Sequence, residues 1–212
     1  MKNNEFEKKT ENFINLLKTA KMENYFNSWI EANKNDKDKN AAEIRCKNLK
    51  QFLTERENAK YILIGEAPSY GARYTGIPMT SEQIIYENPE IFSKSEYKLT
   101  SASIQSEKTA SIIWDEILKI DKTGKNFVLW NAFAFHNIDE KYVKNPTEKE
   151  ISIDENIKIL KTFLGLFPDS KIIALGRKAQ FAVSQALTEY IRHPSHGGEK
   201  TFRENFKLLI EK

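Results

Sequence analysis

The chain has 212 residues, with 33 Lys and Arg against 30 Asp and Glu and a formal net charge of +3. This balance excludes a polyelectrolyte-type binder, so any contact with nucleic acid must come from local placement of basic residues. A single cysteine, Cys46, excludes an internal disulfide, a cysteine zinc site and a four-cysteine iron–sulfur cluster. No signal-like segment or apolar run of about 18 residues occurs, so we expect a cytoplasmic, monomeric protein with a single domain over 1–212 and no membrane partner.

Residues 1–57 are predicted to form a helical N-terminal extension. Apolar residues recur at roughly helical spacing in two stripes, which comprise Phe13, Leu17, Met22, Phe26, Trp29 and Ile30, then Ala42, Cys46, Leu49 and Leu53. The segment between them, residues 33–40, has nearly cancelling charges and is interpreted as a solvated loop rather than a nucleic-acid contact.

The remaining chain, with a core over 60–205, alternates between strand and helix patterns. The predicted strands are 61–65, 127–131, 171–175 and a weaker one near 187–192, and the predicted helices are 107–120, 153–167 and 177–187. Ser152 and Glu155 have the spacing of a capping box for the second helix. Residues 81–106 lack clear periodicity and are predicted to contain loops over a cleft. The alternation predicts an α/β three-layer sandwich with a central parallel sheet of about four strands, plus the N-terminal helices.

Three segments place polar residues where predicted strands end. The first is Gly65-Glu66-Ala67-Pro68, the second is Asn131 at the end of 127–131, and the third is His193-Pro194-Ser195. Open α/β sheets bind ligands in crevices at the carboxyl ends of their strands. We therefore expect Glu66, Asn131 and His193 to converge on one cleft.

In this order, the three segments resemble the motifs of the uracil-DNA glycosylase superfamily. The resemblance covers roughly residues 60–205 and implies a monofunctional DNA glycosylase that needs no metal and no cofactor. The implied partner is DNA with a flipped-out or single-stranded target base. Gly65-Glu66-Ala67-Pro68 resembles the first motif of branches that often carry an iron–sulfur cluster, but the cysteines of such a cluster are missing here.

The first motif implies a base pocket made of Gly65, Ala67, Pro68, Ser69 and Met79, together with Asn131. Ala67 stands where the best-known branch has a catalytic aspartate, so Glu66 is the nearest carboxylate for catalysis or ligand contact. Its alternative role is to cap loop amides. Ser69 replaces a glycine or a tyrosine of the relatives, and Met79 replaces a stacking phenylalanine. Both changes favour a base larger than uracil, although ordinary sequence drift explains them equally well.

The second and third motifs imply the groups that hold the base. Asn131 resembles the residue that reads the pyrimidine edge, and its amide orientation decides between uracil-like and cytosine-like edges. His193 resembles the histidine that hydrogen-bonds the base O2 as negative charge builds there. The residues interpreted as DNA contacts are Arg177, Lys178, Arg192, Ser195, His196 and Gly197, with Arg73 either among them or folding the first loop. The leucine that usually wedges into the duplex is missing, since His196-Gly197-Gly198 follows the motif.

The sequence alone is consistent with four functions. The leading hypothesis is hydrolysis of the N-glycosidic bond of uracil or a related pyrimidine in DNA, with Glu66, Asn131 and His193 as catalytic residues. A close alternative is removal of a hypermodified phage base in antiviral defence. The others are a catalytically weak nucleic-acid-binding module, which Ala67 favours, and a different α/β hydrolase acting on nucleotides.

Overall fold

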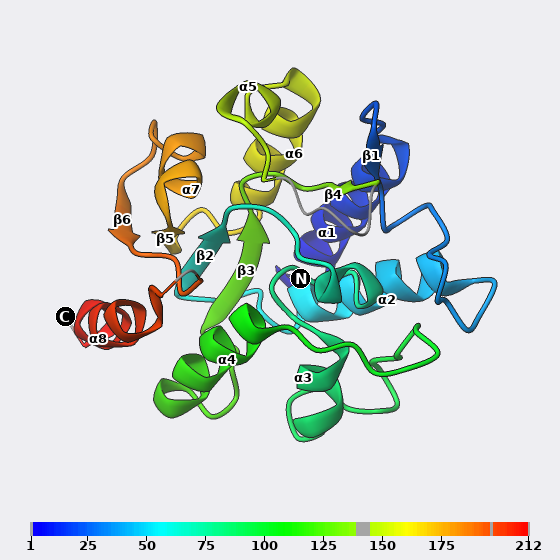
Figure 1. Cartoon of the computed structure of the whole chain (residues 1–212), viewed down its shortest axis with the longest axis horizontal. Coiled ribbons are helices and arrows are strands. Elements are labelled where there is room, and N and C mark those ends of the chain that lie inside the picture. The colour runs from blue at the N-terminus through cyan, green and yellow to red at the C-terminus, as the bar shows by residue number, and fades with distance from the viewer. Residues whose placement is uncertain (1, 139–144, 196, 212) are drawn as a thin grey trace.

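A computed structural model of the chain describes residues 2–138, 145–195 and 197–211 (Figure 1). Four strands form the central sheet, and they are β2 (Tyr61–Gly65), β3 (Phe127–Asn131), β5 (Lys171–Leu175) and β6 (Thr188–Ile191). Their order across the sheet is β3-β2-β5-β6, and every neighbouring pair is parallel. The predicted α/β fold with a four-stranded parallel sheet is confirmed.

Helices connect these strands and precede and follow them. They are α1 (Lys2–Thr19), α2 (Ala41–Thr54), α3 (Glu82–Glu87), α4 (Lys108–Ile120), α5 (Glu148–Ile151), α6 (Asp154–Leu164), α7 (Arg177–Ala182) and α8 (Glu199–Ile210). A short 3-10 turn, Gly71–Tyr74, follows β2, and a two-residue pair, β1 (Tyr25–Phe26) with β4 (His136–Asn137), forms a small antiparallel ribbon.

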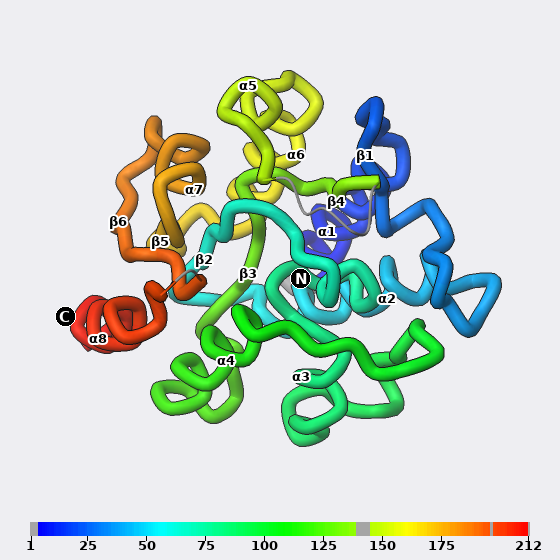
Figure 2. Tube along the Cα trace, in the orientation of Figure 1, coloured from blue at the N-terminus to red at the C-terminus, as the bar shows by residue number. Residues whose placement is uncertain are grey.

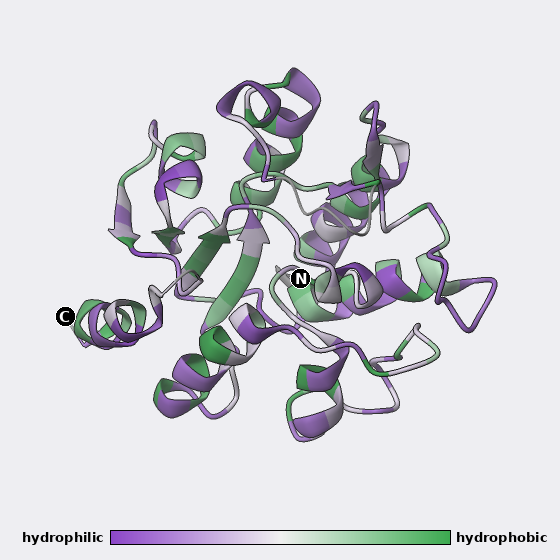
Figure 3. Ribbon diagram, in the orientation of Figure 1, coloured by the Kyte–Doolittle hydropathy of each residue, from purple (hydrophilic) through white to green (hydrophobic). Residues whose placement is uncertain are grey.

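Two layers of helices cover the sheet. On one face, Phe13 of α1 and Phe163 of α6 pack on Trp130 of β3, with ring centroids 5.1 and 4.7 Å apart. On the other face, α8 places Phe206 against Phe127 of β3 at 5.8 Å, and α4 contacts α8. Figure 3 shows β2 and β3 in the green of hydrophobic residues, while the helices around them carry purple, hydrophilic surfaces. Because β3 is apolar on both faces, it is buried between the layers, as parallel strands usually are.

The path of the chain places β2 at a switch point of the sheet. From β2 the chain crosses through α3 and α4 to β3 on one side, and then returns through α5 and α6 to β5 on the other (Figure 2). The connections leaving β2 and β3 therefore diverge above the carboxyl edge of β2. Ligand crevices of open α/β sheets form at such a point.

Part of the N-terminal extension departs from the predicted helical character, whereas the predicted loop over residues 33–40 does lie outside helices. Residues 20–40 lie outside helices, and the reason is visible at Asn27, whose side chain accepts from Trp29 N–H at 2.9 Å and donates to the carbonyls of Leu17 and Ala20. Buried Arg45 then binds the carbonyls of Ser28 and Glu31, both at 2.6 Å. Side chains thus satisfy this backbone in place of a helix ladder.

One further expectation is wrong, and another is confirmed only in part. The capping box uses Thr147 and Glu150 at the start of α5, whereas α6 begins after Ile153 without a side-chain cap. Residues 81–106 contain helix α3, and the carboxylate of Glu82 accepts from the backbone N–H groups of Thr100 and Ser101 at 2.7 and 2.9 Å. The segment is therefore folded back on a buried carboxylate. In the described part of the chain, no helix is long and apolar enough to cross a membrane.

Candidate active site

A cleft of about 390 Å³ opens at the carboxyl edge of the sheet. All four strands of the sheet deliver residues to it: Glu66 follows β2, Asn131 ends β3, Arg177 follows β5 and His193 follows β6. The remaining lining residues are Ala67, Pro68, Ser69, Met79, Glu107, Thr109, Asn145, Gly176, Tyr190, Arg192 and Ser195. The structure thus brings the three residues expected to be catalytic, and most of the expected base pocket, to one place.

Asn131 is the most constrained polar group of the cleft. Its side chain is 1% exposed, and among the described residues neither its Oδ1 nor its Nδ2 has a hydrogen-bond partner. Leaving a buried amide unsatisfied costs about 1–3 kcal/mol per group. An amide in this state is suited to a ligand that offers both a donor and an acceptor on one edge.

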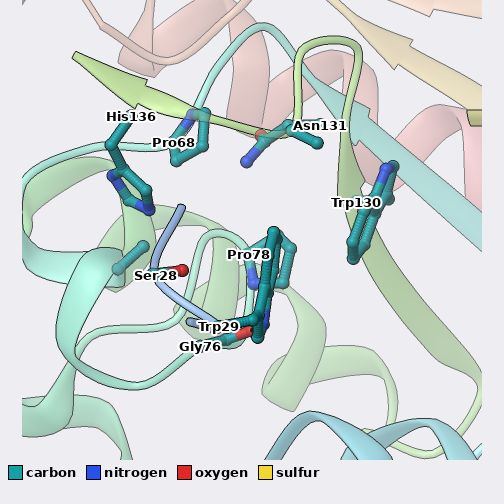
Figure 4. A pocket seen from close by; sticks show the side chains of 10 residues that line it. Ser28, Trp29, Pro68, Gly76, Pro78, Trp130, Asn131 and His136 are labelled. Carbon is teal, nitrogen blue, oxygen red and sulfur yellow. Dashed lines mark hydrogen bonds between the residues drawn. The ribbon is translucent and has the colours of Figure 1, made fainter. Parts of the chain in front are cut away.

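A second, much smaller cavity lies directly behind Asn131. It measures about 10 Å³, and Figure 4 shows Pro68, His136 and Asn131 on one side of it with Ser28, Trp29 and Gly76 on the other. The indole N–H of Trp29 donates to the carbonyl of Gly76 at 3.1 Å. Ser28 and Trp29 of the N-terminal extension therefore line this small cavity.

Gly65 packs against Asn131 and Met79, which both line the cleft. A Cβ on Gly65 would lie 2.6 Å from Asn131 Oδ1 and 2.7 Å from Met79 Sδ, so this position requires glycine. Met79 is buried and has a φ of 50°, a left-handed conformation that non-glycine residues rarely adopt. Such strained positions concentrate at ligand sites because the surrounding structure must hold them.

Glu66 lies at the mouth of the cleft in an ion pair. Lys178, in the first turn of α7, places its Nζ 2.8 Å from Glu66 Oε1, and both side chains are partly exposed. Lys178 was expected to contact a DNA phosphate. In this structure its partner is the carboxylate of Glu66. Its neighbour Arg177 is exposed and lines the cleft. The turn from β5 into α7 passes through Gly176, whose φ of 91° only glycine adopts readily.

His193 is oriented by the loop in which it lies. Its Nδ1 is 2.7 Å from the hydroxyl of Ser195 and also accepts the backbone N–H of Ser195 at 3.2 Å. Since a backbone N–H is always a donor, Nδ1 is the unprotonated nitrogen, and Nε2 carries the proton in neutral imidazole. The histidine is thereby prepared to donate from Nε2.

Arg73 is not at the surface of the cleft. It is 4% exposed, its guanidinium donates to the carbonyl of Asn137 at 2.5 Å, and it stacks over Phe26 at 4.5 Å. The interpretation of Arg73 as a phosphate contact is therefore wrong, and it folds the first loop. His136 lies behind the same loop, where burial, with Arg73 and Arg45 nearby, holds its pKa well below the usual range.

The remaining expected DNA contacts are distributed around the third motif. Arg192 and Ser195 line the cleft, while Gly197 follows with a φ of 74° and is not among the lining residues. His196 lies outside the described residues. No group of three or more His, Cys, Asp or Glu side chains in the described ranges is arranged to hold a metal ion.

Glu107 is the most informative lining residue that the sequence patterns missed. It is the N-cap residue of α4, and burial raises the pKa of its carboxyl group to about 7. Thr109, Asn145 and Tyr190 were also missed. No local motif marks these positions, because the crossover helices and the last strand bring them to the cleft from outside the three segments.

Comparisons with known proteins agree with this architecture. The sequence model of the "Uracil DNA glycosylase superfamily" matches residues 52–210. The crystal structure of wild-type Pedobacter heparinus SMUG2 is similar, with a TM-score of 0.67 and 15% sequence identity over 96% of this chain and 99% of that one. A search of curated proteins found no significant match. On the strength of the family match, which begins in α2 and ends in α8, the chain belongs to the uracil DNA glycosylase superfamily.

Proposed function

We propose that the chain is a DNA glycosylase that hydrolyses the N-glycosidic bond of uracil, or of a related pyrimidine, in DNA, with residues 60–205 as its catalytic core. The superfamily match supports the reaction class. The observation that carries the proposal is the buried amide of Asn131, which has no hydrogen-bond partner among the described residues, in a cleft that Glu66 and His193 also line. A flipped-out base supplies the donor and acceptor that this amide lacks.

The three side chains divide the work according to their chemistry. Asn131 pairs with the edge of the base, with its carbonyl accepting from N3–H and its amino group donating to O4 when the base is uracil. The Nε2–H of His193 donates to the base O2, where negative charge builds as the glycosidic bond breaks. Glu66 places a carboxylate beside the sugar, which becomes oxocarbenium-like, and beside the attacking water.

The surroundings of the cleft support a nucleic-acid substrate. Arg177 and Arg192 line the cleft on the side of the third motif, and Ser195 adds a hydroxyl for a flanking phosphate. The formal net charge of the chain is only +3, so this local cluster would supply much of the attraction to DNA.

A cleavage screen tests the proposal. Single- and double-stranded oligonucleotides carrying one uracil, hypoxanthine, 5-hydroxymethyluracil or glucosylated 5-hydroxymethylcytosine are incubated with the protein, and abasic sites are then cut with alkali. We expect cleavage at uracil or at a 5-substituted pyrimidine, and none with Asn131→Ala. Tight DNA binding without release of any base would instead indicate a binding module that has lost turnover.

A 5-substituted pyrimidine is the second candidate substrate, and the small side chain of Ser69 favours it. Ser69 lines the cleft at a position that resembles the glycine of some branches and the tyrosine of the best-known branch, and Glu107 adds a carboxylate to the same cleft. A tyrosine there would fill space that a hydroxymethyl group or a larger substituent needs.

A further inference from the structure

Glu107 is a second carboxylate in the cleft, and it arrives by a different route from Glu66. It occupies the N-cap position of α4, without a side-chain cap bond, on the crossover from β2 to β3. It lines the same cleft as Glu66, Asn131 and His193, together with Ser69 of the first motif. Glu107 therefore belongs to the wall of the site and not to the outer surface of α4.

The environment of Glu107 leaves one oxygen available for chemistry. Its Oε2 is buried and has no hydrogen-bond partner among the described residues. Its neighbour Lys108 points away, with a side chain that is 87% exposed and lies 3.8 Å from Glu199. Among the described residues, the charged or titratable side chains that face the cleft from the other elements are Glu66 with Lys178, Arg177, Tyr190, Arg192 and His193.

The two carboxylates of the cleft, Glu66 and Glu107, differ in their neighbouring groups. Oε1 of Glu66 lies 2.8 Å from the ammonium of Lys178. Among the described residues, Glu107 forms no ion pair and its Oε2 has no hydrogen-bond partner. Pairs of carboxyl groups in contrasting environments commonly divide acid–base work between them.

We propose that Glu107 is the general base of the reaction, which takes the proton from the hydrolytic water at its buried oxygen Oε2. This inference rests on the proposed glycosylase function and adds a catalytic residue to it. Glu66, held by Lys178, then keeps its negative charge beside the sugar while Glu107 performs the proton transfer.

The step balances without any further reactant. The water oxygen forms a bond to C1′ of the sugar as the bond between C1′ and the base nitrogen breaks, and the electron pair of that bond leaves with the base. One water proton moves to Glu107 Oε2. The base anion takes a proton from solvent, and Glu107 later returns its own proton to solvent, so the products are a C1′ hydroxyl and a neutral base.

The ionisation of Glu107 suits this role. Burial raises its pKa to about 7, so at neutral pH a large fraction is ionised while the conjugate acid is weak enough to make the carboxylate a useful base. General bases are most effective when their pKa lies near the working pH.

Single-turnover kinetics on the substrate found in the screen test the proposal, with Glu107→Gln as the variant, because glutamine keeps the shape of the side chain and cannot accept the proton. We expect the chemical step to slow about 10²–10³-fold with DNA affinity unchanged. We also expect the wild-type rate to rise about tenfold per pH unit below 7 and then to level off. This pH-dependent rise should be absent in the variant. Glu90→Gln, at an exposed position on the protein surface, is the matched control.

A second measurement needs no turnover and separates this inference from the proposed function. DNA with a cationic pyrrolidine sugar in place of the target nucleotide mimics the oxocarbenium-like sugar. We expect its affinity for the wild-type protein to rise as the pH is raised through about 7, and this rise to be lost in Glu107→Gln. A protein that releases no base yet shows this titration would overturn the proposed function alone. Unchanged kinetics, or an unchanged pH limb, in Glu107→Gln would overturn the role of Glu107, as would a missing titration in the wild type.

Discussion

Ser195 holds the imidazole of His193 from two directions, with its hydroxyl 2.7 Å from Nδ1 and its backbone N–H donating to the same nitrogen at 3.2 Å. The backbone contact does not depend on the serine side chain, so it fixes the tautomer in any variant that preserves the loop. The hydroxyl adds orientation. This arrangement separates the contribution of the histidine from that of the serine.

We therefore expect His193→Ala to lower the rate of base release about 10²–10³-fold, which corresponds to roughly 3–4 kcal/mol of transition-state stabilisation. DNA binding should change little, because the histidine acts mainly where charge develops. Ser195→Ala should cost about tenfold or less, since the backbone N–H still selects the tautomer. Single-turnover rates and fluorescence anisotropy measure the two quantities. A collapse of binding with the rate per bound complex preserved would make His193 a positioning residue.

Gly65→Ala should disable the base pocket without unfolding the protein. The new Cβ would lie 2.6 Å from Asn131 Oδ1 and 2.7 Å from Met79 Sδ, so both side chains must move out of the pocket wall. We expect a rate loss of at least about tenfold, as misplaced substrate-binding groups commonly cause. Gly165→Ala is the matched control, because its Cβ would meet only ordinary contacts at 3.4 Å and its φ of −67° suits alanine. Equal activity of both variants would contradict this account of the pocket.

Much of the sheet was predictable because its signals are local. The apolar runs at 61–65, 127–131 and 171–175 match β2, β3 and β5, and the weaker run near 187–192 contains β6. Each run ends where polar residues begin, so the residues delivered to the carboxyl edge followed from the same pattern. For this reason the order of residues along the chain is enough to assign Glu66, Asn131 and His193 to one cleft.

The features that were missed depend on contacts between distant segments. Phe26 and Trp29 have helical spacing, but the side chain of Asn27 bonds the carbonyl of Leu17 and the backbone N–H of Trp29. Arg45 also binds the carbonyl of Ser28. An asparagine followed by a serine is a turn signal that could have corrected this prediction. For Glu107 no comparable signal exists, because its proximity to Ser69 is created by the crossover that carries α4 back over the sheet.

Arg177→Ala should weaken DNA binding in a salt-dependent way. Arg177 is exposed at the cleft, whereas its neighbour Lys178 is paired with Glu66. Loss of one phosphate contact should reduce the slope of log K against log salt by about 0.7 on single strands. Affinity is measured at several salt concentrations. Lys122→Ala, on the loop between α4 and β3 at the opposite edge of the sheet, should leave the slope unchanged.

Glu107→Gln should change the pH dependence of stability as well as the rate. The pKa of Glu107 is raised from 4.5 to about 7 in the folded protein, so the folded state binds more protons than the unfolded state between these values. The stability linked to this group is fully present below pH 4.5 and is lost as the pH rises through about 7. Glutamine has no such penalty. In urea unfolding we expect the variant to gain on the order of 1–3 kcal/mol relative to wild type between pH 5 and pH 8. A pH-independent difference would show that Glu107 is not desolvated in solution.

Ser69→Tyr should discriminate between substrates by size. Ser69 lines the cleft and leaves space that a tyrosine would fill, so the variant should reject a 5-substituted pyrimidine more than uracil, by roughly 1–3 kcal/mol in kcat/KM. Ser69→Ala is the control that removes the hydroxyl and keeps the space. It should leave the discrimination between the two substrates unchanged. If Ser69→Tyr slows both substrates equally, the ring disrupts the first loop, and the pocket does not select by size. Strong wild-type activity on uracil, with no turnover of any 5-substituted base, would leave uracil as the substrate and make the missing tyrosine irrelevant to selection.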